Sequence, residues 1–230
     1  MKRFTLAAGL CLFTLTTPLA GKETPAKPGV QTRESQAAMT PSAALERLKA
    51  GNARFAANEM KERDWSAKVV ATASGQFPYA AILACMDSRA PVEVVFDQGL
   101  GDVFGIRVGG NVVNDDELGS LEYALKVGAK LIVVLGHSDC GAVKGAIDDV
   151  KLGNLTGLLA KIHPAVAAAG CHSSKDGACV TKVAEMNVRQ SMKEIPARSP
   201  YLRKYLDEGK VKLVGAMYDV ATGRVTFLND

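Results

Sequence analysis

The chain alternates short, continuous hydrophobic runs with longer segments in which apolar residues recur at helical spacing. Uninterrupted apolar runs are typical of strands that are buried on both faces of a sheet, and their alternation with helices predicts an α/β fold with a mostly parallel central sheet. The last two runs are separated by a short turn that contains glycine, so we expect a hairpin that makes the sheet mixed at one edge. The predicted strands are Tyr79–Cys85, Val103–Val108, Lys130–Leu135, Val211–Tyr218 and Arg224–Leu228.

The segments between these runs predict helices that flank the sheet. Leu45, Leu48 and Phe55 lie on one face of a helix predicted over Ser42–Asn58. Asp116–Val127 carries acidic residues at its start and a lysine near its end, which the helix dipole favours. Further helices are predicted over Gly141–Val150, Leu155–Ala169, Ala178–Ile195 and Pro200–Asp207.

The first forty residues lack this alternation. Lys2 and Arg3 precede a short apolar run, which is typical of a secretory signal peptide. We expect residues 1–20 to be removed on export to the periplasm, leaving no membrane anchor; a retained signal anchor is the alternative. Residues 21–40 are rich in Lys, Pro, Thr and Gln, which predicts a flexible linker before a single folded domain over residues 41–230.

Composition narrows the classes of function. The chain has 230 residues, of which 47% are hydrophobic and 23% are charged, so it can bury a sizeable core. Its formal net charge of +4 is too small to indicate nucleic-acid binding, and we expect no nucleic-acid partner. One of the five cysteines, Cys11, lies in the apolar part of the predicted leader, which leaves four cysteines for the folded domain.

Two short polar segments follow predicted strands directly. Cys85–Arg89 reads CMDSR after the run YAAILA, and His137–Cys140 reads HSDC shortly after the run KLIVVL. In open α/β sheets, functional sites form at the carboxyl ends of the strands. If these two strands are neighbours, Cys85, His137 and Cys140 come together.

Two thiolates and one imidazole are ligands that suit zinc in a tetrahedral site. Three protein ligands leave a fourth position open, which is the pattern of a catalytic site rather than a structural one. The alternatives are that Cys85 and Cys140 pack as small apolar side chains, or that they form a disulfide. Asp87 and Arg89 would lie beside the metal, where a guanidinium keeps a carboxylate ionised; an ordinary ion pair is the alternative.

The motif CxDSR, followed about fifty residues later by HxxC, resembles the β-class carbonic anhydrases. The likeness extends from AALERLKAGNARF at Ala43–Phe55 to KLVGAMYDVATGRVTFL at Lys212–Leu228. It implies that Cys85, His137 and Cys140 bind one Zn²⁺ per subunit. It also implies a zinc lyase that hydrates carbon dioxide reversibly to bicarbonate and a proton, and that assembles as a homodimer or homotetramer.

The resemblance further assigns residue roles. It implies attack by zinc-bound hydroxide that Asp87 and Arg89 orient, and a closed state in which Asp87 is the fourth zinc ligand. Gln76, Phe104 and Tyr123 match residues that line the substrate pocket in this family; plain packing is the alternative for these three. Two rival functions remain. One is hydrolysis of carbonyl sulfide or carbon disulfide, which some relatives catalyse, and the other is a non-catalytic zinc-binding or redox module.

The sequence departs from the family pattern at two positions. Val108 stands where many members have asparagine, and Ile82 stands where members with a regulatory bicarbonate site have tryptophan. We therefore do not expect that regulatory site, although Arg107 and Tyr218 resemble its other partners.

The remaining cysteines, Cys171 and Cys179, enclose a polar segment, CHSSKDGAC, which predicts an exposed loop. In an oxidising periplasm we expect them to form a disulfide, and two unpaired thiols are the alternative.

Overall fold

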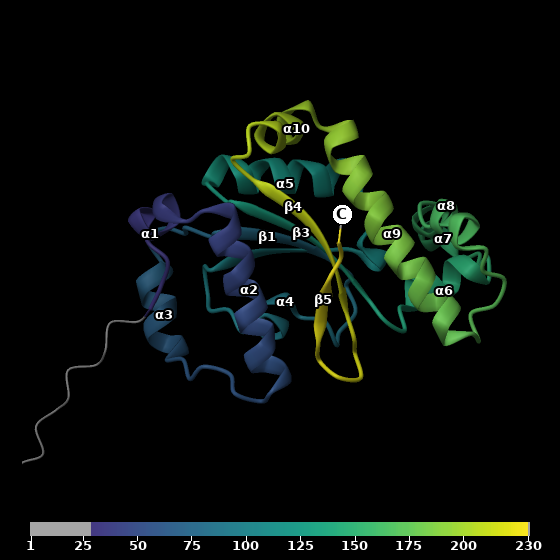
Figure 1. Ribbon diagram of the computed structural model, residues 1–230, viewed down its shortest axis with the longest axis horizontal. Helices are drawn as coiled ribbons and strands as arrows, with labels where there is room; N and C mark the ends of the chain where they lie inside the picture. Colours follow the sequence, from purple (N-terminus) through teal and green to yellow (C-terminus); the bar gives the residue numbers. More distant parts are fainter. Residues whose placement is uncertain (1–28, 230) are drawn as a thin grey trace, which may run out of the picture.

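The computed structural model describes residues 29–229. Within them, five strands form one sheet in the order β2-β1-β3-β4-β5 (Figure 1). The neighbours among β1 to β4 pair in parallel, whereas β5 pairs with β4 in antiparallel orientation, so the predicted α/β sheet with one mixed edge is confirmed. The strands are β1 (Ala80–Ala84), β2 (Val103–Arg107), β3 (Leu131–His137), β4 (Lys212–Tyr218) and β5 (Val225–Phe227).

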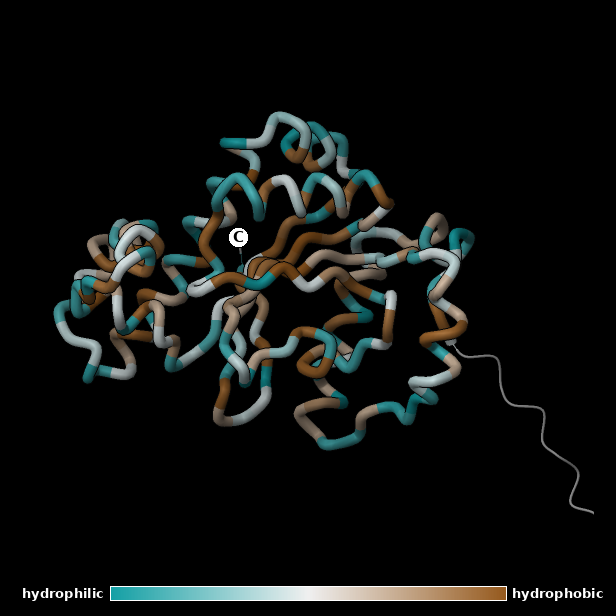
Figure 2. The backbone as a smooth tube through the Cα atoms, turned by 180° about the vertical axis from the view of Figure 1, so that it is seen from behind, coloured by the Kyte–Doolittle hydropathy of each residue, from teal (hydrophilic) through white to brown (hydrophobic). Residues whose placement is uncertain are grey.

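Helices cover both faces of this sheet, and the hydrophobic strands lie between them (Figure 2). Alternate side chains of a strand point to opposite faces. Ile82 of β1 packs in a cluster with α2 and α4, while its neighbour Leu83 packs with α5, α9 and α10 on the other face. These helices are α2 (Pro41–Ala56), α4 (Val92–Val95), α5 (Asp115–Val127), α9 (Gly177–Arg198) and α10 (Pro200–Asp207). Burial on both faces explains why β1 and β3 read as unbroken apolar runs.

A third apolar cluster lies beside the carboxyl ends of β1 and β3. It joins α6 (Gly141–Ile147), α7 (Gly153–Ala160) and α8 (His163–Ala169) to the first half of α9, and it also includes Cys85 and Cys140. A single helix was predicted over Leu155–Ala169, but the structure has two helices there, α7 and α8, with a proline in the first turn of α8.

The amino-terminal region also differs from expectation. The predicted leader, residues 1–20, lies outside the described residues. Part of the segment predicted as a flexible linker forms helix α1 (Arg33–Ala38), because a capping box at Thr32 satisfies its first turn. The buried Gln36 then donates a hydrogen bond from Nε2 to the carbonyl of Pro78 at 2.7 Å, which ties α1 to the domain.

Helix α3 (Trp65–Thr72) was not predicted from the sequence; Asp64 caps its amino end. Its exposed residues include Trp65, Val69 and Val70, so it lacks the apolar and polar periodicity that indicates a helix. None of the helices described is long and apolar enough to span a membrane.

Candidate active site

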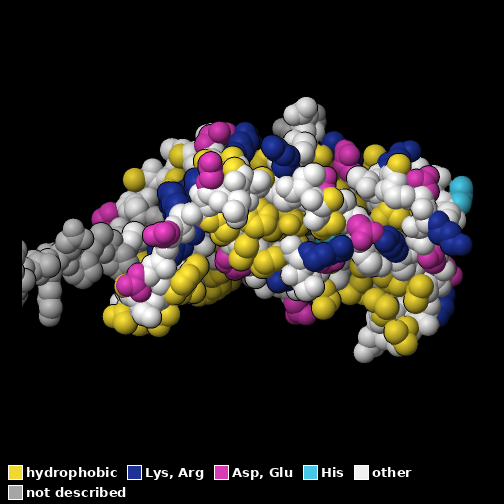
Figure 3. Space-filling view, turned by 90° about the horizontal axis from the view of Figure 1, so that it is seen from below, with side chains coloured by type: hydrophobic (Ala, Val, Ile, Leu, Met, Phe, Trp, Pro, Cys, Tyr) yellow, Lys and Arg dark blue, Asp and Glu magenta, His cyan; other side chains and the backbone are white. Residues whose placement is uncertain are grey.

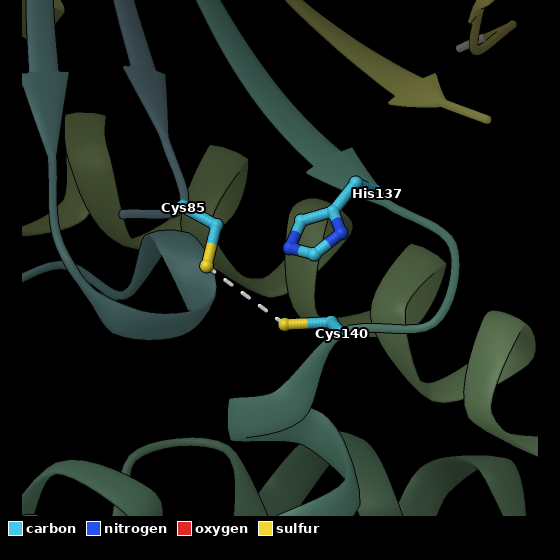
Figure 4. Close-up of side chains that lie close together, drawn as sticks. All are labelled: Cys85, His137 and Cys140. Carbon is cyan, nitrogen blue, oxygen red and sulfur yellow. Dashed lines mark hydrogen bonds between the residues drawn. The ribbon is translucent and has the colours of Figure 1, made fainter. Parts of the chain in front are cut away.

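Strands β1 and β3 are parallel neighbours, so the residues that follow them meet at one edge of the sheet. Cys85 follows β1, His137 is the last residue of β3, and Cys140 is the N-cap residue of α6. Their side chains point toward one another (Figure 4). All three are buried, and their ligand atoms lie within 4.8 Å of one another. The structure thus brings together the three residues predicted to bind the metal.

The two sulfur atoms have the spacing of metal ligands rather than of a disulfide. Cys85 Sγ and Cys140 Sγ are 3.9 Å apart, whereas a disulfide requires about 2.05 Å. Both thiols are free, so the alternative of a Cys85–Cys140 disulfide is wrong. Two sulfurs bound at about 2.3 Å to a tetrahedral zinc would lie about 3.8 Å apart. The pair therefore fits zinc without rearrangement.

The imidazole of His137 is oriented as a metal ligand. Its Nδ1 lies 2.8 Å from the carbonyl oxygen of Ser138, which accepts the Nδ1 proton. This leaves the lone pair on Nε2, and that buried nitrogen has no hydrogen-bond partner among the described residues. Buried polar atoms are rarely left unpaired, and a backbone carbonyl that fixes the far nitrogen is typical of metal-binding histidines. The donor set therefore fits zinc.

The environment favours the thiolate form of Cys85. The sulfur atoms of Cys85 and Cys140 are in hydrogen-bond contact, and the amide of Gly110 donates to Cys85 Sγ at 3.3 Å. The Cys140 contact contributes most to a lowering of the pKa of Cys85 to about 4, against the effect of burial. The same contact with Cys85, together with burial, raises the pKa of Cys140. Burial lowers the pKa of His137, but contact with the Cys85 sulfur and its charge, helped by the Ser138 carbonyl and Asp87, outweighs this and raises it.

Asp87 and Arg89 form a two-point ion pair beside this cluster. Asp87 Oδ1 accepts from Arg89 Nε at 3.0 Å, and Oδ2 accepts from Nη2 at 2.8 Å. The guanidinium holds the pKa of the Asp87 carboxyl well below its usual range. Asp87 Oδ2 is 3.9 Å from His137 Nε2, so an ionised oxygen lies next to the nitrogen that would bind the metal.

Two further residues, which the sequence did not assign to the active site, hold this ion pair in place. Asp139 Oδ2 accepts from Arg89 Nη1 at 3.2 Å, and Asp139 also pairs with Lys144. Asp139 lies inside the HSDC motif, so its position in the sequence could have indicated that it belongs to the active site. Arg107 donates to the backbone carbonyls of Cys85 and Asp87, and only the pairing of β1 with β2 reveals this contact.

Comparison with known proteins agrees with this geometry. A family model described as carbonic anhydrase matches residues 80–225. The chain is 38% identical over 188 residues to carbonic anhydrase 2 of Mycobacterium tuberculosis, which spans 80% of this chain and 91% of that relative. The chain belongs to the carbonic anhydrase family.

Solved structures identify the class. A β-carbonic anhydrase of Aspergillus fumigatus is 27% identical, has a TM-score of 0.65, and covers 82% of this chain and 90% of its own. A β-carbonic anhydrase of Sordaria macrospora, from a study of two tetrameric enzymes, is 26% identical and has a TM-score of 0.64. It covers 72% of this chain and 91% of its own. This carbonic anhydrase is therefore a β-class enzyme.

The predicted pocket residues of this carbonic anhydrase lie away from the cysteine and histidine cluster. Gln76 precedes β1 and lines a surface hollow with Thr72 and Leu100. Phe104 and Tyr123 contact each other with ring centroids 6.0 Å apart, and they line a separate groove on the edge strand β2 and helix α5. Within one described chain, the structure does not bring these three to the cluster.

The residues that correspond to a regulatory bicarbonate site have other neighbours in this carbonic anhydrase. Ile82 is fully buried in the sheet, and Tyr218 is 4% exposed, so that burial raises the pKa of its hydroxyl. The guanidinium of Arg107 is hydrogen-bonded to backbone carbonyls.

The other two cysteines form a disulfide. Cys171 follows α8 and Cys179 lies in the first turn of α9, and the bond between them closes the polar loop. Both side chains pack in or against the apolar cluster that also contains Cys85 and Cys140. The disulfide therefore braces the helices beside the candidate metal site without using its ligands.

Proposed function

We propose that this chain hydrates carbon dioxide reversibly to bicarbonate and a proton at one zinc centre held by Cys85, His137 and Cys140. The observation that carries the proposal is the unpaired, buried Nε2 of His137, which faces two free cysteine sulfurs. Family membership supports the same reaction. A bound zinc with an open position supplies Lewis-acid chemistry that makes water nucleophilic near neutral pH.

The residues of the chain supply orientation. Ser138 fixes the imidazole ring through Nδ1, so that Nε2 remains the ligand atom. We propose that Asp87 accepts a hydrogen bond from the attacking water and aims its lone pair at the substrate. Because Arg89 keeps the pKa of Asp87 far below neutral, Asp87 cannot retain a proton there. Asp87 therefore orients the nucleophile, and the released proton passes to solvent.

The same ion pair controls a second proposed state. In it, Asp87 is released from Arg89 and would offer its carboxylate to a bound zinc as a fourth ligand, in competition with water. The short distance between Asp87 Oδ2 and His137 Nε2, 3.9 Å, supports a movement of the side chain alone. The two hydrogen bonds from the Arg89 side chain oppose that movement, so Arg89 favours the active state.

We propose that the enzyme works as a homodimer or homotetramer. Hydrophobic side chains gather in exposed patches on one face (Figure 3). The exposed apolar residues include Trp65, Val70 and Tyr123, and such patches are typical of interfaces. We propose that a second subunit brings Gln76, Phe104 and Tyr123 to a neighbouring zinc site, because within one chain they line hollows away from the cluster. The tetrameric β-carbonic anhydrases of Sordaria macrospora support this assembly.

We also propose that the enzyme acts in the periplasm after removal of the predicted leader. The Cys171–Cys179 disulfide supports this location, because disulfides persist in oxidising compartments.

The test is stopped-flow hydration of carbon dioxide together with measurement of zinc content. We expect the wild-type enzyme to hold one zinc per chain, and Cys140→Ala to lose both zinc and activity. The double variant Cys171→Ala/Cys179→Ala is the matched control, since it removes two cysteines and no proposed ligand. A Cys140→Ala variant with full activity would refute the proposal.

A further inference from the structure

A polar cavity lies at the amino ends of the strands, whereas the metal site lies at their carboxyl ends. Its volume is about 440 Å³, and α2, α3 and the loop after α4 contribute to its walls. Asp102, which lies in its lining, precedes β2, whereas Cys85 follows β1. The cavity is thus at the amino ends of these strands, and the helices that line it, α2 and α3, lie at the opposite end of the molecule from α6 (Figure 1). Five cationic side chains and three carboxylates line it.

Two of these carboxylates are buried and position the arginines around them. The Asp97 side chain is fully buried, and its two oxygens pair with Arg54 and Arg63 at 2.5 Å each. The Asp102 side chain is 6% exposed; it pairs with Arg47 at 3.2 Å and accepts from the amide of Gly99. The charge of Asp97 is therefore offset by two arginines and that of Asp102 by one, although Asp102 Oδ1 has no hydrogen-bond partner among the described residues.

The arginines keep hydrogen-bond donors free. Arg54 uses only Nε on Asp97, so both of its terminal amino groups lack partners among the described residues. Arg47 contacts Asp102 through one terminal nitrogen and lies over the ring of Tyr79, 4.5 Å from its centroid. A guanidinium carries five donors in a fixed plane, so both side chains retain donors for an oxyanion.

Lys68 is buried without a direct ion pair, although Asp102 Oδ2 would lie 3.3 Å from the same Cβ position at Gly99 that Nζ approaches. It is only 6% exposed, and its Nζ donates to the backbone carbonyl of Gly29 at 2.7 Å. No carboxylate of the described residues lies within ion-pair distance of it. A Cβ at Gly99 would lie 2.9 Å from Nζ, so the glycine leaves room for the ammonium. A buried ammonium has three donors and is costly without a partner, which points to an anion in the cavity.

We propose that this cavity binds a doubly charged oxyanion of the phosphate type, between the ammonium of Lys68 and the free donors of Arg47 and Arg54. Guanidinium groups match phosphate oxygens in pairs, and an ammonium adds a point charge. The volume falls within the range of small-molecule sites, so a phosphate group on a small organic molecule fits as well as free phosphate. The site goes beyond the hydration reaction and does not depend on it.

The test is calorimetric titration of the zinc-loaded enzyme with inorganic phosphate and, separately, with glycerol 3-phosphate, at constant ionic strength. We expect saturable binding that raises the melting temperature, and binding at least tenfold weaker in Lys68→Met. Tighter binding of glycerol 3-phosphate identifies a phosphorylated molecule as the ligand, and equal binding identifies free phosphate. Lys49→Met is the matched control, because Lys49 lies on α2 outside this cavity and pairs with Glu46.

The fold of the variant is checked by its melting temperature without phosphate, which replacement of a buried charge by an apolar side chain should not lower. If Lys68→Met fails to fold, Arg47→Gln at the cavity rim replaces it, with the same expected loss of binding. Absence of saturable binding, or binding of equal strength in wild type and the folded variant, overturns the proposal. Binding that survives in the variant would locate the anion elsewhere, for example at the zinc.

Discussion

Asp139 accepts a hydrogen bond from Arg89 across the two loops that carry the metal-binding residues, with Oδ2 3.2 Å from Nη1. The carbonyl of Asp139 accepts a second one from Nη2 at 3.3 Å. Asp139 adopts a left-handed backbone conformation, with φ of 56°, and its carboxylate also pairs with Lys144. Arg89 is therefore held between Asp87 and Asp139, although its side chain is 46% exposed.

Replacing Asp139 with asparagine should weaken the hold on Arg89. The variant leaves the cations of Arg89 and Lys144 without the carboxylate between them, so Arg89 holds Asp87 less firmly. Exposed ion pairs contribute about 0.2–1 kcal/mol, so we expect kcat/KM to fall by about 1.4- to 5-fold with zinc content unchanged. Stopped-flow hydration of carbon dioxide measures this effect.

The control for this experiment is Glu208→Gln. It removes a carboxylate that pairs with Lys210 just after α10 and that contacts neither Arg89 nor Asp87, so kcat/KM should be unchanged. Arg89→Ala should be much slower than Asp139→Asn, because it removes both side-chain hydrogen bonds to Asp87 and leaves only the one from the backbone amide of residue 89. Equal losses in the two variants would contradict the supporting role of Asp139.

Gly110 is the position where a single methyl group should disturb the metal site most directly. Its φ is 66°, its amide donates to Cys85 Sγ, and a Cβ would lie 2.6 Å from Ile162 Cδ1. We expect Gly110→Ala to lower the free energy of unfolding by about 1–3 kcal/mol and to weaken zinc retention. Urea denaturation and a zinc-chelator competition measure the two effects.

The matched control is Gly119→Ala in helix α5, where a Cβ meets nothing within 4 Å. Alanine is favoured over glycine inside a helix, so this variant should raise stability by about 0.5–1 kcal/mol. Equal stability of the two alanine variants would show that backbone conformation and crowding at Gly110 do not limit the stability of the domain.

The sequence predicted the site correctly where reactive residues directly follow strands that are buried on both faces. Cys85 and His137 could be paired because both follow apolar runs, and parallel strands end at one edge. Asp139 was missed because its contact with Arg89, fifty residues away in the chain, depends on the side-chain directions of two loops. Gln76 precedes β1 and Phe104 lies in the first half of β2, so both lie away from the carboxyl ends of the strands, where the cysteine and histidine cluster forms.

Helix boundaries were harder to predict than strands for a local reason. The apolar residues of α7 and α8 continue one helical pattern, and the break before His163 depends on packing against α9 as well as on the following proline. Helix α1 has a polar composition typical of a linker, yet the buried amide of Gln36 anchors it through a contact 42 residues away. Composition alone does not report such contacts.

The Cys171–Cys179 disulfide should stabilise the domain without taking part in metal binding. It closes a short loop, with a sequence separation of 8, and the loop-entropy model gives about 2–3 kcal/mol for such a bond. We expect Cys171→Ala/Cys179→Ala to lose that much stability in urea denaturation while it keeps its zinc. Addition of a phosphine reductant should lower the stability of the wild type toward that of the variant. It should leave the variant itself unchanged, and an equal effect on both would mean that the reductant acts elsewhere.

The buried ion pairs of Asp97 should make stability depend on pH in acid. Burial raises the pKa of this carboxyl, but Arg63 and Arg54 outweigh burial and lower it below the value of about 3.9 in the unfolded chain. The folded state therefore binds this proton less readily, so the stabilisation is complete above about pH 4 and is lost as pH falls through the lowered pKa.

Asp97→Asn should remove this dependence. Breaking a buried pair costs about 3–5 kcal/mol, so the variant should be less stable by that order at pH 7 and should lose less stability than the wild type between about pH 4 and pH 2. Urea denaturation at a series of pH values gives both quantities. Asp115→Asn is the control, because this carboxylate is 96% exposed beside Arg198 and its loss should change stability by less than about 0.5 kcal/mol. A slope in acid that is as steep in Asp97→Asn as in the wild type would show that other carboxylates control acid unfolding.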